Sequence, residues 1–409
     1  MKCGLLGRKL GHSYSPQIHT HLGSYSYDLF EKEPEEVGDF LQNGDFSAIN
    51  VTIPYKQTVI PFCDELSETA RRIGAVNTLV RRPDGRLVGH NTDYFGFLST
   101  VKHAGMDPAG KKVLIIGSGG ASKPAIAVME ELGAQVVVIS HKENTVENLQ
   151  LHRDAAILVN ATPVGMYPNA GASPVDLALF PHLEGVIDMI YNPARTKLLL
   201  DAQARGIVAE NGLWMLVAQA KEAAEWFTGR AIDDTIIKKI HRQLKLQMEN
   251  IILIGMPGSG KSTVGRLLAK KLARDFVDAD EAITKEAGMP IPEIFATSGE
   301  EGFRQIETKV LARLGQESSL VIATGGGCVT RKGNHPLLHQ NGICVWLTRD
   351  LEKLPTEGRP LSQQTKLEQM YQIRKPLYTQ FADYTVDNNA SPEECTAQIL
   401  ELLNLGGNI

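Results

Sequence analysis

The residues with the most specific chemistry form a glycine-rich stretch in the C-terminal third of the chain. Residues 255–262 read G-M-P-G-S-G-K-S, which fits the pattern G-x-x-x-x-G-K-[ST], and they follow the apolar run Ile251–Ile254. A buried strand that leads through a glycine loop into a helix turns backbone N–H groups toward an anion, and the helix N-terminus adds partial positive charge. The stretch therefore predicts a nucleoside triphosphate site, with Lys261 at the β- and γ-phosphates and the Ser262 hydroxyl on Mg²⁺. The residues expected around the phosphates are Gly258, Ser259, Gly260, Lys261, Ser262 and Thr263.

A second glycine cluster follows the predicted strand Lys111–Ile116. Residues 117–122 read G-S-G-G-A-S, a variant of the dinucleotide-binding fingerprint in which Ser122 stands where a third glycine is common. Pro124 suits the first turn of a following helix, where its missing N–H costs nothing. Taken alone, such a cluster is as typical of a structural turn as of a binding site.

The first hundred residues are rich in short polar side chains and contain one well-placed lysine and one well-placed aspartate. Each of these motifs by itself is more typical of a turn or a helix cap. Together, and upstream of a dinucleotide loop, they predict a pocket for a small polyhydroxylated ligand. The residues concerned are Ser13 and Ser15, then Asn50, Thr52 and Lys56, then Asn77, and finally Asp93 in Asn91-Thr92-Asp93.

Length and composition indicate two or three domains, since the chain has 409 residues. A net charge of −5 with scattered Lys and Arg argues against nucleic acid as a partner. The first residues lack the apolar segment of a signal peptide, and no apolar run could span a membrane. Five widely spaced cysteines predict reduced thiols and a cytoplasmic location. The sequence leaves the oligomeric state open, a homodimer included.

Short apolar runs alternate with helix-like stretches, which is typical of α/β domains. The further predicted strands are Val136–Ile139, Ile157–Val159, Val186–Met189, Val321–Ala323 and Cys344–Leu347. Apolar residues at helical spacing predict a helix over Ile232–Met248 that runs almost directly into the strand at Ile251. A domain boundary is therefore expected near Glu249, without a flexible linker.

The order of these motifs resembles two known families. Residues 1 to about 247 resemble shikimate dehydrogenase. Residues 250 to about 405 resemble shikimate kinase, through the segments Asp278-Ala279-Asp280, Gly302-Phe303-Arg304, Gly325-Gly326-Gly327 and Arg374-Lys375-Pro376-Leu377-Tyr378. The resemblance implies an α/β protein: a two-lobed dehydrogenase with a Rossmann-type cofactor lobe, followed by a three-layer P-loop kinase domain. The expected domains are a substrate-binding lobe (1–97 plus 213–247), an NADP-binding lobe (98–212) and a kinase domain (250–409).

For the first half, the resemblance implies NADPH-dependent reduction of 3-dehydroshikimate to shikimate. Lys56 would protonate the carbonyl oxygen, since partial burial can bring a lysine pKa toward neutral, and Asp93 would hold Lys56 in place. The residues expected to grip the substrate are Ser13, Ser15, Asn50, Thr52, Asn77, Asp93, Tyr191 and Gln219. Those expected at the cofactor are Gly117, Ser118, Gly119, Gly120, Ala121, Ser140, His141, Lys142, Met189 and Gly212.

The cofactor-selecting segment departs from the family pattern. NADP-dependent members usually carry Asn-Arg-Thr after the second strand, whereas this chain has Ser140-His141-Lys142. No acidic residue ends the strand at Ile139 to bind the ribose 2′-hydroxyl of NAD, so NADP remains the expected cofactor. Lys142 would face its 2′-phosphate without the fork of an arginine.

For the second half, the resemblance implies transfer of the ATP γ-phosphoryl group to shikimate, which gives 3-phosphoshikimate. Lys261 and Asp280 are the catalytic candidates, and Asp278 would help to order Mg²⁺. Asp280 should share one face of an extended segment with Asp278. Arg304, Gly326 and Arg374 would bind shikimate with Asp280, and Arg359 matches a lid arginine that closes over ATP. The lid, Leu354 to Pro360, is shorter than usual and lacks an obvious second arginine for the adenine contact.

Two other functions remain open at this stage. One half could have become a structural or regulatory nucleotide-binding module for the other. Quinate could also replace shikimate as the dehydrogenase substrate, because one hydroxyl more or less changes few contacts.

Overall fold

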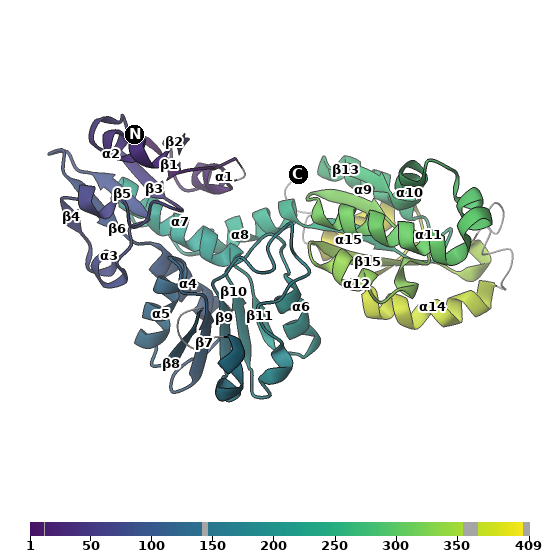
Figure 1. Cartoon of the computed structure of the whole chain (residues 1–409). Helices are drawn as coiled ribbons and strands as arrows, with labels where there is room; N and C mark the ends of the chain where they lie inside the picture. Colours follow the sequence, from purple (N-terminus) through teal and green to yellow (C-terminus); the bar gives the residue numbers. More distant parts are fainter. Residues whose placement is uncertain (12, 141–145, 355–366, 404–409) are drawn as a thin grey trace. The chain divides into compact units, whose positions relative to one another are not determined.

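The computed structural model describes residues 1–11, 13–140, 146–354 and 367–403. Its chain divides into two compact units, which are described separately. The first unit comprises Met1–Tyr191 and Thr196–Leu244, and the second comprises Asn192–Arg195 and Lys245–Ile409. Figure 1 shows that each unit is built from sheets with helices packed on their faces.

The N-terminal lobe of the first unit contains a mixed sheet of order β2-β1-β3-β5-β6-β4. Strand β5 runs antiparallel to both β3 and β6, whereas the other pairs in the sheet are parallel. The strands are β1 (Lys2–Gly7), β2 (Ser26–Glu31), β3 (Ala48–Val51), β4 (Glu65–Leu66), β5 (Thr78–Arg81) and β6 (Leu87–His90). The helices are α1 (Ser15–Thr20), α2 (Val37–Asn43) and α3 (Glu68–Ile73), with α4 (Asp93–His103) leading to the second lobe and α7 (Leu213–Thr228) returning from it.

The second lobe contains an all-parallel sheet of order β11-β10-β9-β7-β8. Successive residues of β7 point to opposite faces. Val113 and Ile115 pack in one core with α4 and α5, and Leu114 and Ile116 pack in another with α6. This two-sided burial confirms the Rossmann-type lobe. The strands are β7 (Lys112–Ile116), β8 (Gln135–Ile139), β9 (Ile157–Asn160), β10 (Gly185–Asp188) and β11 (Val208–Glu210), and the helices are α5 (Ser122–Glu131) and α6 (Lys197–Ala204).

The second unit is a three-layer domain around the parallel sheet β13-β14-β12-β15-β16. Ile251 and Leu253 of β12 pack in the core formed with α9 and α15, and Ile252 and Ile254 pack in the core formed with α10, α11 and α14. The strands are β12 (Asn250–Ile254), β13 (Asp275–Asp278), β14 (Leu320–Ala323), β15 (Gly342–Thr348) and β16 (Tyr384–Asp387). The helices are α9 (Lys261–Leu272), α10 (Ala279–Ala287), α11 (Ile291–Gln316), α12 (Asn334–His339), α14 (Leu367–Phe381) and α15 (Pro392–Leu402).

The predicted helix at the domain boundary is present, but it starts later than expected. Helix α8 spans Thr235–Met248 rather than Ile232–Met248. The Asp233 carboxylate accepts a hydrogen bond from the Thr235 N–H at 2.8 Å, an Asx turn that lies just before the helix. The periodic apolar pattern does not reveal such a local polar contact.

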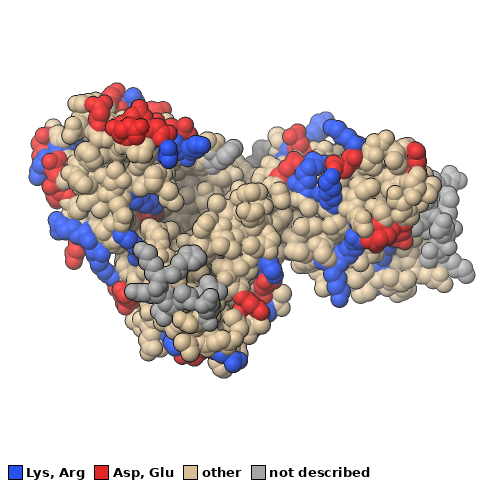
Figure 2. Space-filling view, viewed as in Figure 1, with Lys and Arg blue, Asp and Glu red and all other residues tan. Residues whose placement is uncertain are grey.

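Three features of the structure can be compared with the composition: the distribution of charged side chains, the state of the cysteines and the polarity of the helices. On the face drawn in Figure 2, Lys and Arg side chains are interspersed with Asp and Glu. All five cysteines are free thiols. In the described part of the chain, every helix is too short or too polar to cross a membrane.

Candidate active sites

The first unit brings Lys56 and Asp93 into direct contact. Lys56 lies in the turn after β3, and Asp93 is the first residue of α4. The Lys56 Nζ donates to Asp93 Oδ2 at 2.7 Å, with the side chains 21% and 11% exposed. A largely buried, charge-assisted hydrogen bond of this length fixes the position of the ammonium group.

A hydrogen-bond network beside this pair reaches Gln219 on α7 through Thr92, the residue before Asp93. Asn77 Oδ1 accepts from the Thr92 backbone N–H at 2.7 Å, and Asn77 Nδ2 donates to the Thr92 hydroxyl at 3.1 Å. That hydroxyl lies 3.4 Å from Gln219 Oε1. Asn50 joins from β3, since its Nδ2 donates to the Thr78 hydroxyl at 3.2 Å. Three of the expected substrate residues, Asn50, Asn77 and Gln219, are therefore held by one network.

The remaining expected substrate residues lie at the ends of neighbouring elements. Ser13 Oγ accepts from the backbone N–H of Ser15, the first residue of α1, at 3.2 Å. Thr52 follows β3, and its N–H donates to the Leu6 carbonyl at 2.9 Å. The Tyr191 ring packs edge-on against Tyr14, with ring centroids 6.2 Å apart, and burial raises the pKa of the Tyr191 phenol.

The glycine loop after β7 presents exposed backbone. Gly117 has φ +109°, a conformation that favours glycine, and a Cβ there would lie 2.9 Å from Thr162 Cγ2. A Cβ on Gly119 or Gly120 would meet no atom within 4 Å. The Ser122 hydroxyl donates to the Gly119 carbonyl at 2.7 Å, so the serine in place of a third glycine braces the turn.

The other residues expected at the cofactor follow β8 and β10 or lie at the start of α7. Ser140 follows β8, and His141 and Lys142 lie outside the described residues. Met189 and Gly212 approach closely, because a Cβ on Gly212 would lie 2.1 Å from the Met189 carbonyl oxygen. Glycine is therefore required at position 212, where α7 begins.

The second unit has a pocket of about 790 Å³ around the P-loop. Gly260 is the N-cap of α9 with φ +90°, and Lys261 is the first residue of that helix. Lys261 Nζ donates to the carbonyls of Gly255 and Met256, both at 2.9 Å. The predicted phosphate-contacting residues Gly258, Gly260, Lys261, Ser262 and Thr263 line the pocket, whereas Ser259 is fully buried beside it.

The two acidic residues of this pocket do not lie on one extended segment, so that prediction is wrong. Asp278 ends β13 and is the N-cap of α10, and its Oδ1 accepts from the Asp280 N–H at 3.0 Å. The chain therefore turns into a helix at Ala279, because the short Asp278 side chain satisfies a free N–H of the first turn. Both aspartates still line the pocket, and the Ser262 hydroxyl donates to Asp278 Oδ2 at 2.6 Å.

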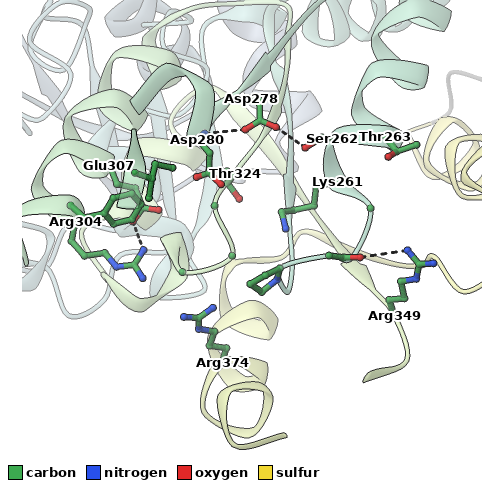
Figure 3. Close-up of a pocket in the computed structure, with 18 of the residues that line it drawn as sticks. Lys261, Ser262, Thr263, Asp278, Asp280, Arg304, Glu307, Thr324, Arg349 and Arg374 are labelled. Carbon is green, nitrogen blue, oxygen red and sulfur yellow. Dashed lines mark hydrogen bonds and ion pairs between the residues drawn. The ribbon is translucent and has the colours of Figure 1, made fainter. Parts of the chain in front are cut away.

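Two buried arginines line the same pocket (Figure 3). Arg304 on α11 donates to Glu307 Oε2 at 2.7 Å, and its guanidinium packs on Gly327, where a Cβ would lie 2.1 Å from Nη2. Burial raises the pKa of the Glu307 carboxyl, and Arg304 offsets part of this effect. Arg374 on α14 is 7% exposed. The Tyr378 hydroxyl donates to the Gly326 carbonyl, which fixes the glycine triplet, and Arg359 lies outside the described residues.

Comparison with known proteins identifies the first unit. The chain is 37% identical over 259 residues to the NADP-dependent shikimate dehydrogenase of Caldicellulosiruptor bescii, an alignment that covers 55% of this chain and 89% of that protein. The family model of the shikimate dehydrogenase substrate binding domain matches residues 5–79. The chain belongs to the shikimate dehydrogenase family.

Solved structures of this family have the same fold as the first unit. Shikimate dehydrogenase 1 from Peptoclostridium difficile is 38% identical with a TM-score of 0.55, over 60% of this chain and 98% of that chain. The Thermus thermophilus enzyme, solved in complex with NADP(H) and shikimate, is 32% identical with a TM-score of 0.54, over 59% of this chain and 99% of its own. The family model of shikimate kinase matches residues 257–404, so the shikimate dehydrogenase is joined to a kinase domain.

Two residues that organise these sites were not predicted from the sequence. Thr92 connects Asn77 to Gln219 in the dehydrogenase unit, and its place directly before Asp93 was the available signal. Glu307 holds Arg304 in the kinase unit. Its spacing of three residues from Arg304 on a helix indicates a contact, but the depth of its burial depends on tertiary packing.

Proposed function

We propose that this bifunctional shikimate dehydrogenase and kinase catalyses two consecutive reactions. The first unit reduces 3-dehydroshikimate to shikimate with NADPH, and the second phosphorylates shikimate with ATP to 3-phosphoshikimate. The Lys56–Asp93 pair at 2.7 Å carries the dehydrogenase assignment, since it offers a fixed ammonium donor beside a polar network. The P-loop pocket, with Asp280 and two buried arginines, supports the kinase assignment.

In the dehydrogenase, Lys56 is the general acid for the carbonyl oxygen. NADPH, when bound at the exposed glycine loop, supplies a hydride to the carbonyl carbon. Lys56 Nζ donates a proton to the oxygen, while Asp93 keeps the ammonium oriented by their hydrogen bond. Ser13, Ser15 and the Asn50–Asn77–Gln219 network supply hydroxyl and amide groups for the carboxylate and ring hydroxyls of the substrate.

The loop after β7 fits a dinucleotide phosphate, because Gly119 and Gly120 are exposed and have open space around them. We assign NADP rather than NAD, since no acidic residue ends the strand at Ile139. The name of the C. bescii relative supports this choice. Steady-state assays with both cofactors test it: kcat/KM should be higher with NADPH, and a higher value with NADH would overturn the assignment.

In the kinase, Asp280 is the general base and two arginines orient the substrate. The shikimate hydroxyl oxygen forms a bond to the γ-phosphorus of ATP as the bond to the ADP oxygen breaks, and Asp280 accepts the hydroxyl proton. Arg304 and Arg374 bind the shikimate carboxylate, and Lys261 stabilises the phosphoryl oxygens. The adjacent Ser262 hydroxyl and Asp278 carboxylate form an oxygen donor set that suits Mg²⁺, which neutralises phosphate charge when bound.

Two separate half-reactions test the proposal on the full-length chain. Shikimate with NADP⁺ should produce NADPH, and shikimate with MgATP should release ADP. Failure of one half-reaction in a folded protein would favour the alternative of a single active enzyme with a passive module. Replacing shikimate by quinate in the first assay tests the substrate: faster quinate oxidation would replace our assignment.

A further inference from the structure

A third arginine of the kinase pocket has no role in the reaction described above. Arg349 follows β15, and it lines the pocket together with the P-loop. Strand β15 lies in parallel between β12, which leads into the P-loop, and β16, which leads into Asn388. The carboxyl ends of these strands meet at one edge of the sheet, so Arg349 and Asn388 flank the P-loop by topology.

Contacts at the P-loop confirm this placement. Arg349 Nη1 lies 3.5 Å from the Gly258 carbonyl oxygen, and Asn388 Nδ2 donates to the Ser259 carbonyl at 2.7 Å. A Cβ on Gly260 would lie 2.3 Å from Asn388 Nδ2 and 3.9 Å from Arg349 Nη1. Both side chains therefore lie against the same three residues of the loop.

Each of these side chains also has a polar atom without a partner. Arg349 Nε and Asn388 Oδ1 are buried and have no hydrogen-bond partner among the described residues. Asn388 is 3% exposed. An unpaired buried donor or acceptor is destabilising, so a polar ligand bound in the adjacent pocket would stabilise both side chains.

The positions of Arg304, Arg374 and Arg349 indicate which part of ATP Arg349 contacts. Figure 3 shows Arg304 and Arg374 on one side of the P-loop and Arg349 on the other, across Lys261 from Asp280. Under the proposed function, the transferred phosphoryl group lies at Asp280. The P-loop holds the phosphates, and the rest of the nucleotide extends away from Asp280 toward Arg349.

We propose that Arg349 binds the nucleotide, with the flat face of its guanidinium against the base. This inference rests on the kinase function and adds a residue that the lid, with its single arginine, does not provide. A guanidinium stacks on an aromatic ring, which a lysine ammonium cannot do in the same way. Arg349 thus contributes to nucleotide affinity, separately from the arginines that bind shikimate.

Binding titrations with two ligands test the contact without relying on catalysis. MgADP contains the base, whereas magnesium pyrophosphate contains only the phosphates. Arg349→Ala should weaken MgADP binding about tenfold and leave pyrophosphate binding within about twofold. Arg349→Lys keeps the positive charge but lacks the planar guanidinium group, so it should show most of the same loss of MgADP affinity. Arg313→Ala, at an exposed arginine of α11 outside the pocket, is the matched control and should bind both ligands normally.

The outcomes separate this inference from the proposed function. If Arg349→Ala binds MgADP and pyrophosphate equally more weakly than wild type, Arg349 contacts the phosphates and not the base. If it binds MgADP as wild type does, Arg349 does not contact the nucleotide. Either result overturns the proposal. Wild-type binding by Arg349→Lys would exclude the stacked geometry. In kinase assays, Arg349→Ala should raise KM for ATP about tenfold but KM for shikimate less than about twofold. If wild type binds MgADP but does not phosphorylate shikimate, the kinase assignment fails while the titrations still test Arg349.

Discussion

Replacing Lys56 by alanine should disable the dehydrogenase and spare the kinase in the same polypeptide. The substitution removes the group that donates the proton in reduction and accepts it in oxidation, and general acid–base catalysis contributes about 10²- to 10⁴-fold. We therefore expect kcat for shikimate oxidation to fall by about a hundredfold or more, which corresponds to about 2.7 kcal/mol of transition-state stabilisation. Phosphorylation of supplied shikimate should stay within about twofold, because the two sites share no residues and effects at independent sites add.

The contact with Asp93 allows a sharper test by a double-mutant cycle. Asp93→Asn keeps the side-chain shape but removes the charge that holds Lys56 at 2.7 Å. A hydrogen bond to a charged group contributes about 1.5–3 kcal/mol, so this variant should lose roughly 10- to 150-fold in kcat. If Asp93 acts through Lys56, the double variant should be about as slow as Lys56→Ala alone. Independent effects would instead multiply.

The assay follows NADPH formation from shikimate and NADP⁺, with ADP release from the kinase unit as the folding control. Lys102→Ala, which changes an exposed lysine on α4, is the matched control and should retain both activities. Lys56→Ala with more than a tenth of wild-type turnover would refute the assignment of the proton donor. Multiplicative losses in the cycle would refute the positioning role of Asp93.

Further predictions concern the kinase and the stability of the cofactor lobe. Asp280→Asn should reduce kinase turnover by about a hundredfold through loss of the base and leave NADPH oxidation unchanged, and intact kinase turnover would refute this assignment. Burial raises the pKa of the Asp188 carboxyl from 3.8 to about 6, so the folded state keeps a proton that the unfolded state releases, and stability falls as pH rises through this window. Between pH 5 and 7, wild type should therefore lose about 1 kcal/mol more unfolding free energy than Asp188→Asn in urea titrations, and parallel pH profiles would contradict this.

The sheets of the cofactor lobe and the kinase domain could be predicted from the sequence because their central strands are buried on both faces. Runs such as Ile157–Val159 and Val321–Ala323 contain only apolar residues, and both form buried strands in parallel sheets. The mixed sheet of the N-terminal lobe could not be predicted in the same way. Its antiparallel pairing of β5 with β3 and β6 depends on contacts between strands far apart in sequence.

The candidate sites were predictable where motifs fix local geometry. The P-loop and the glycine loop after β7 both follow strands, as expected. The turn into α10 at Asp278 was missed because a single capping hydrogen bond ended the extended segment. Glu307 and Arg349 were missed because burial and packing against a distant loop, rather than a motif, bring them to the pocket.

A coupled assay of the purified full-length chain tests the central claim most directly. The chain is supplied with 3-dehydroshikimate, NADPH and MgATP, and the products are separated chromatographically. The account predicts that NADPH is oxidised and that 3-phosphoshikimate appears. Accumulation of shikimate without its phosphate, or the absence of NADPH oxidation in a folded protein, would contradict the claim that both halves are active enzymes.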